Sequence, residues 1–118
     1  MRILLAILLL TSCTVMGHRD APVDWPRLKV IEHHVSSREM ADVCYANIKV
    51  PMWLRLLGAN LEGCALIYFD KKECHVWVSS DFPDARVLAH ERLHCRGYDH
   101  ESSSTLADAW KEWKRAPR

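Results

Sequence analysis

The stretch HERLHCRGYDH, residues 90–100, carries three histidines at fixed offsets from one another. On a helix, His90 and His94 lie one turn apart, so both imidazoles project from the same face and can take two corners of a tetrahedral zinc site. Gly97 is the residue type that lets a helix end at positive φ, and such a turn would bring His100 to the same ion. The pattern therefore predicts a site of three imidazoles with a fourth position open to water.

Glu91 follows the first of these histidines and is the candidate catalytic group. In helices with the pattern His-Glu-x-x-His, this carboxylate can take a proton from a zinc-bound water and later donate it to a leaving amine. A bare His-Glu-x-x-His arises by chance on surface helices, but the added glycine and third histidine make coincidence much rarer. We therefore expect Glu91 to be the general base beside a Zn²⁺ ion.

The same stretch resembles the zinc-binding helix of the metzincin peptidases, and Tyr98 with Glu101 makes it most similar to the astacin variant. The resemblance implies a zinc metallopeptidase in which Glu91 is the catalytic base. Its metal ligands would be His90, His94 and His100. The match covers about a dozen residues of the chain.

Two features of the chain depart from the metzincin pattern. Metzincins carry a methionine-containing turn after the third histidine, whereas the last methionine here is Met52. Only residues 101–118 follow His100, which is short for the lower subdomain that walls the substrate cleft. The sequence thus predicts a minimal, metzincin-like peptidase domain.

The N-terminal segment predicts export and a lipid anchor. Residues 1–12 contain one basic residue and then an apolar run too short to span a bilayer, which is typical of a signal peptide. The letters LTSC at residues 10–13 resemble a bacterial lipobox, so we expect Cys13 to be lipidated and residues 13–27 to be a tether. The alternatives are an ordinary signal peptide or a short buried helix.

The expected location is the bacterial cell envelope. Thr14, rather than Asp, follows the lipobox cysteine, which favours the outer membrane with the domain facing the periplasm. The expected partners are this membrane and a peptide or protein substrate, and the protein is expected to be a monomer. Removing Arg2 leaves fifteen basic residues against fifteen acidic ones, and no basic stripe predicts nucleic-acid binding.

The four remaining cysteines predict two disulfides, because an even number in an exported chain of 118 residues supplies the cross-links that a small core needs. Cys74 should open the strand before the zinc helix, and Cys95 should lie near the far end of that helix. Antiparallel packing would bring the two together. We therefore favour Cys74 with Cys95 and Cys44 with Cys64, over a cysteine zinc site, which would need closer spacing.

Residues 28–118 are predicted to form one α+β domain, with a small, mostly antiparallel sheet and the zinc helix packed across it. The expected elements are a strand at 28–35, a helix from a Ser36 cap to about 47, a hairpin of 63–69 with 74–79, the zinc helix at 85–96 capped by Asp84, and a last helix after residue 105. Residues 48–57 fit a strand, a loop or a wall of the cleft.

Three further residues near the predicted site have two interpretations each. Asp99 is expected to fix a histidine tautomer from outside the ligand set, or else to be an oxygen ligand. Tyr98 could donate to a reaction intermediate or simply pack. By the metzincin resemblance the strand at 74–79 would be a sheet edge that pairs with substrate, so Trp77 would line the cleft or pack in the core.

Two other functions remain open from the sequence. One is hydrolysis of amide bonds in cell-wall peptides, which the expected periplasmic location permits. The other is a non-enzymatic lipoprotein that binds zinc, which the missing methionine turn favours. The intact Glu91 argues for an enzyme.

Overall fold

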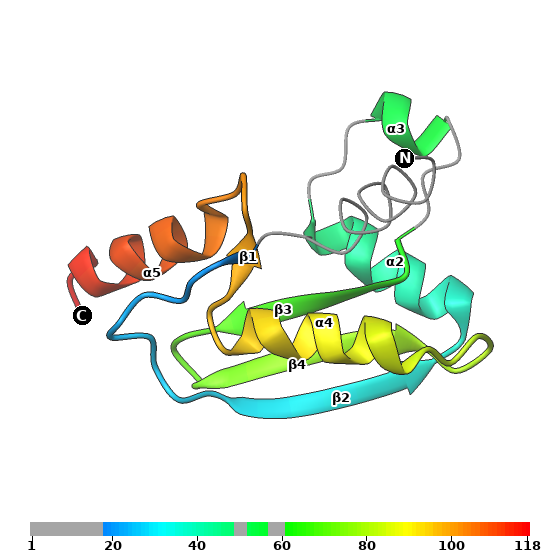
Figure 1. Ribbon diagram of the computed structural model, residues 1–118, viewed down its shortest axis with the longest axis horizontal. Helices are drawn as coiled ribbons and strands as arrows, with labels where there is room; N and C mark the ends of the chain where they lie inside the picture. Colours follow the sequence, from blue (N-terminus) through cyan, green and yellow to red (C-terminus); the bar gives the residue numbers. More distant parts are fainter. Residues whose placement is uncertain (1–17, 49–51, 57–60) are drawn as a thin grey trace, which may run out of the picture.

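The computed structural model describes residues 18–48, 52–56 and 61–118 (Figure 1). The predicted signal peptide and Cys13 lie outside these residues. The elements, in chain order, are β1 (His18–Arg19), β2 (Lys29–Val35), α2 (Ser37–Asn47), α3 (Met52–Leu56), β3 (Gly63–Tyr68), β4 (Glu73–Ser79), α4 (Ala85–Cys95), β5 (Asp99–His100) and α5 (Thr105–Arg115). None of the described helices is long and apolar enough to cross a bilayer.

The main sheet has the order β2-β4-β3, with β4 in the centre. The hairpin of β3 and β4 is antiparallel, as predicted, but β2 runs parallel to β4, with Val30 opposite Cys74. The sheet is therefore mixed: the predicted α+β class and the antiparallel hairpin are confirmed, whereas β2 joins the sheet as a parallel strand. The physical reason is the connection through α2, which leaves β2 and returns the chain to the same end of the sheet, so that the following hairpin turns β4 parallel to β2.

The central position of β4 also corrects the expectation for Trp77. Because β4 is paired on both sides, its backbone cannot add an extended substrate as an edge strand would. Trp77 instead packs against the core cluster that includes Met40, and its ring stacks on His33 with the centroids 4.0 Å apart. The packing interpretation of Trp77 is therefore the correct one.

Helices cover both faces of this sheet. Alternate residues of β4 point to α4, and they form the most buried part of the core with Val76 fully buried. The opposite face packs against α2 through Met40 and Cys44. Figure 1 shows α4 lying along β3 and β4, with its last turn beside β5. The sheet thus acts as the base on which α4 is held.

Two disulfides fix these helices to the sheet, with the predicted pairing. Cys44 of α2 is bonded to Cys64 of β3, and Cys74 of β4 is bonded to Cys95 of α4. All four side chains are nearly inaccessible to solvent. Each bond therefore ties one helix to one strand within a core that contains few large apolar residues.

The helix caps also follow the sequence. The Ser36 hydroxyl accepts a hydrogen bond from the Glu39 amide at 3.2 Å, and the Asp84 carboxylate accepts one from the Arg86 amide at 2.9 Å. These bonds satisfy amide groups that a helix N-terminus leaves without an internal partner. Of the undecided segment 48–57, the structure describes residues 52–56 as the short helix α3.

Residues 18–27 belong to the fold, although the sequence predicted them to be part of a tether. β1 pairs with β5, so the chain is already in a sheet at residue 18. Trp25 then contacts Phe69 and Trp110 in an aromatic cluster beneath α5, and Asp24 forms an ion pair with Lys114. Proline and mixed charges suggested a linker, but a single tryptophan supplies enough apolar surface to dock the segment.

The two disulfides allow a matched test of how the fold supports the zinc helix. Their sequence separations are 20 and 21 residues, so replacing either pair by alanine should lower the free energy of unfolding by about 3 kcal/mol. Only the Cys74→Ala/Cys95→Ala pair should also weaken metal binding, because Cys95 adjoins His94. Urea unfolding and a metal titration check this. Equal metal affinity in the two double variants would contradict it.

Candidate metal centre

α4 places His90 and His94 on one face, as the four-residue spacing predicts. Their Nε2 atoms lie 3.1 Å apart. Two nitrogens bound at about 2.0–2.1 Å to one tetrahedral zinc ion would be separated by about 3.3 Å. The pair therefore already has nearly the spacing that a shared metal ion needs.

The turn after α4 ends the helix through two hydrogen bonds. The Tyr98 amide donates to the Leu93 carbonyl at 3.1 Å, and the Gly97 amide donates to the His94 carbonyl at 2.9 Å. Together they form a Schellman motif, whose left-handed residue is Gly97 with a φ of 90°. The predicted glycine turn is present, and it reverses the chain toward the histidines.

His100 lies in β5, directly after this turn. Its imidazole stacks on His94 with ring centroids 5.0 Å apart and lies edge-on to His90 at the same centroid distance. One ligand atom from each of the three histidines falls within 4.8 Å of the others. The structure therefore brings together the three predicted ligands, and this group could hold a metal ion.

A backbone carbonyl fixes the tautomer of His94. Nδ1 of His94 lies 2.8 Å from the carbonyl oxygen of Tyr98. Because a carbonyl can only accept, Nδ1 must carry the proton, and Nε2 is left with its lone pair toward the other histidines. Tyr98 thus orients a candidate ligand through its backbone carbonyl, while its ring lies beside Arg96.

Asp99 does not fix a histidine tautomer, and it is not in the group of candidate ligands. Its buried carboxylate accepts hydrogen bonds from the backbone amides of His100 and Leu106, at 2.8 and 3.1 Å, and from the Ser103 hydroxyl. Asp99 therefore shapes the turn that follows the site and holds the backbone of His100. The sequence could not predict this role, because it depends on the folded positions of backbone amides that follow Asp99 in the chain.

Glu91 is buried, with 7% of its surface exposed. Burial raises the pKa of its carboxyl to about 7, and no hydrogen bond or ion pair to the other described residues offsets this. Burial also lowers the pKa of His90 and of His94, and the neighbouring histidines lower both further. Burial therefore favours the neutral, ligand-competent forms of His90 and His94, and it lets the Glu91 carboxyl exchange its proton near neutral pH.

Trp25 supports the glycine turn, a role that the sequence analysis did not predict. Its indole N–H donates to the Cys95 carbonyl at 3.0 Å, so it satisfies an acceptor at the helix C-terminus. A Cβ on Gly97 would lie only 2.6 Å from Cδ2 of the indole. The only sequence signal was one tryptophan in an otherwise polar, proline-containing segment.

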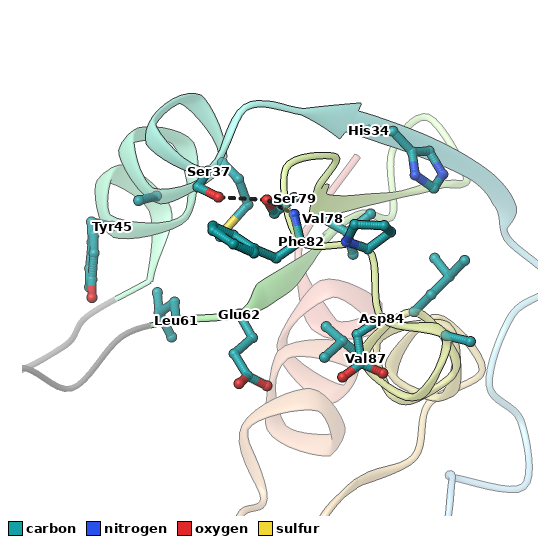
Figure 2. Close-up of a pocket in the computed structure, with 15 residues that line it drawn as sticks. His34, Ser37, Tyr45, Leu61, Glu62, Val78, Ser79, Phe82, Asp84 and Val87 are labelled. Carbon is teal, nitrogen blue, oxygen red and sulfur yellow. Dashed lines mark hydrogen bonds between the residues drawn. The ribbon is translucent and has the colours of Figure 1, made fainter.

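An apolar cavity lies elsewhere on α4. It has a volume of about 700 Å³ and is lined by α2, the end of β4, the following loop and the first turn of α4. Figure 2 shows Val78, Phe82 and Val87 in its lining. Neither Glu91 nor any of the three histidines lines it. The metal centre and this apolar cavity are therefore separate features of the same helix.

Comparison of this sequence with protein-family models, with curated proteins and with solved structures found no match.

Gly97→Ala should damage both stability and metal binding. A left-handed φ costs an alanine about 1–2 kcal/mol, and the new methyl group would also collide with Trp25. We expect the free energy of unfolding to fall by at least about 2 kcal/mol, as measured in urea. In a Trp25→Ala background, Gly97→Ala should lower the free energy of unfolding by less, because the indole that the methyl group would meet is gone. An equal loss of unfolding free energy in both backgrounds would contradict this role of Trp25.

Proposed function

We propose that the protein is a zinc-dependent metallopeptidase, held in the bacterial cell envelope by a lipid on Cys13. One observation carries this proposal. Three imidazoles present nitrogens within 4.8 Å of one another, and the first of them is followed on the same helix by the buried Glu91. Three nitrogen ligands with an adjacent carboxylate are the set that hydrolytic zinc sites use.

Zinc, when bound, would supply a Lewis acid that polarises a peptide carbonyl and lowers the pKa of water. The chain's own groups divide the remaining work. His94 keeps its proton on Nδ1, which donates a hydrogen bond to the Tyr98 carbonyl, and so presents Nε2 toward the other histidines. Glu91 takes the proton of the attacking water and passes it to the amine that leaves.

The exposure of the three histidines gives a direction of approach. His90 and His94 are half-buried, whereas His100 is exposed. A substrate would therefore reach the centre from the side of His100 and the two-stranded β1–β5 sheet. The substrate cannot pair with β4, because β4 is the central strand and is already paired on both sides.

A second candidate is a lipoprotein that binds zinc without turnover. The position of the 700 Å³ cavity favours it, because that cavity is not lined by the histidines. The two candidates differ in what Glu91 does. A binding protein has no use for a buried carboxyl on the residue that follows a ligand, whereas a hydrolase depends on it.

Glu91→Gln should abolish hydrolysis and leave zinc binding intact. Loss of a general base lowers turnover by about 10²–10⁴-fold. The measurement is cleavage of an unfolded, dye-labelled protein and of purified peptidoglycan by the zinc-loaded full chain. The peptidoglycan arm covers the alternative of a cell-wall amide as substrate.

Glu112→Gln is the matched control, since Glu112 is an exposed glutamate on a helix away from the site. It should retain wild-type turnover. Equal turnover in wild type and Glu91→Gln would contradict the mechanism. Stoichiometric zinc in the wild type without cleavage of either substrate would favour the binding protein.

A further inference from the structure

A fourth histidine lies beside the three candidate ligands. β1 and β5 are antiparallel, and His18 is the residue directly opposite His100. Directly opposed residues in an antiparallel pair project from the same face, with Cβ atoms about 4.5–5.5 Å apart. The imidazole of His18 therefore lies on the side of β5 from which His100 reaches the metal centre.

The electrostatics of the site agree with this position. Burial is the main cause that lowers the pKa of His90 and of His94, and a charge on His18 adds to the lowering in both. His18 is thus near enough for both half-buried imidazoles to sense it. It acts on them from β1, some seventy residues earlier in the chain.

His18 is close to the centre without belonging to its ligand set. The ligand atoms within 4.8 Å of one another come from His90, His94 and His100 alone among the described residues. The His18 side chain is exposed and makes no hydrogen bond or ion pair with the rest of the described chain. Its ring nitrogens are therefore available to a molecule that enters on the exposed side of His100.

We propose that His18 is a ligand-binding residue of the metal centre, and that its imidazole N–H donates a hydrogen bond to an oxygen of the molecule that the centre takes up. The class of ligand is a carboxylate, hydroxamate or peptide carbonyl, each of which offers an oxygen acceptor. The inference rests on the proposed metal site, but its test does not depend on turnover.

The geometry distinguishes this role from two others. A fourth metal ligand would have to join the 4.8 Å group, which His18 does not. Unlike the exposed His34, which lies opposite Val78, His18 lies opposite a candidate ligand. Direct opposition to His100 makes His18 the side chain that β1 contributes to this site.

The test uses the full chain loaded with Co²⁺, whose visible absorption changes when acetohydroxamate binds. His18→Ala should weaken acetohydroxamate binding about tenfold, the effect of one charge-assisted hydrogen bond, with Co²⁺ affinity within about twofold of wild type. His18→Gln should recover part of the loss, because the amide can donate. The control is His34→Ala, which removes an exposed histidine that is hydrogen-bonded to Glu32 on β2. This variant should bind acetohydroxamate with wild-type affinity.

Two results would overturn the proposal. One is unchanged acetohydroxamate affinity in His18→Ala. The other is a loss of Co²⁺ affinity in His18→Ala as large as the loss of acetohydroxamate affinity, which would make His18 a metal ligand. Failure of the wild type to bind Co²⁺ would overturn the metal centre itself. Normal binding of both probes without hydrolysis of any peptide would remove the peptidase and leave the role of His18 standing.

Discussion

The arrangement of the site depends on the left-handed turn at Gly97. A helix can place His90 and His94 together by its own periodicity, but it cannot supply the third histidine. That residue arrives only because the chain reverses within three residues, and the reversal requires a backbone conformation that disfavours side chains. The absence of a Cβ has a second use, since it lets Trp25 lie directly against the turn.

The rest of the fold holds this turn in place from several directions. The Cys74–Cys95 disulfide fixes the last residue of α4 to the sheet, and Trp25 donates to the carbonyl of the same cysteine. The carboxylate of Asp99 secures the backbone on the far side of the turn. These constraints converge on about five residues, in a domain whose core has few large apolar side chains.

Residues 18–25 pack on the turn and on β5 rather than forming a spacer. β1 begins five residues after Cys13, and five extended residues span at most about 18 Å. A lipid on Cys13, as proposed, would therefore keep the histidines close to the membrane surface. Substrates or ligands that reach the site would be those available near that surface.

Local patterns were sufficient for much of this structure. The caps at Ser36 and Asp84, the hairpin and the glycine turn follow from residue types at short spacing. The pairing of the disulfides followed from the expected packing of the zinc helix against the strand before it. Contacts between distant segments could not be predicted in this way. The parallel pairing of β2 with β4 and the docking of Trp25 depend on which surfaces meet after folding, and no local pattern encodes that.

The most direct measurement is the zinc content of the purified, disulfide-bonded chain, compared with that of a His94→Ala variant. His94 has both a fixed tautomer and a nitrogen 3.1 Å from its neighbour in the site, so its loss should remove a pre-positioned ligand. We expect one zinc ion per wild-type chain and loss of zinc from the variant on dialysis. Absence of zinc from the wild type, or equal zinc in both proteins, would contradict a metal centre built from these three histidines.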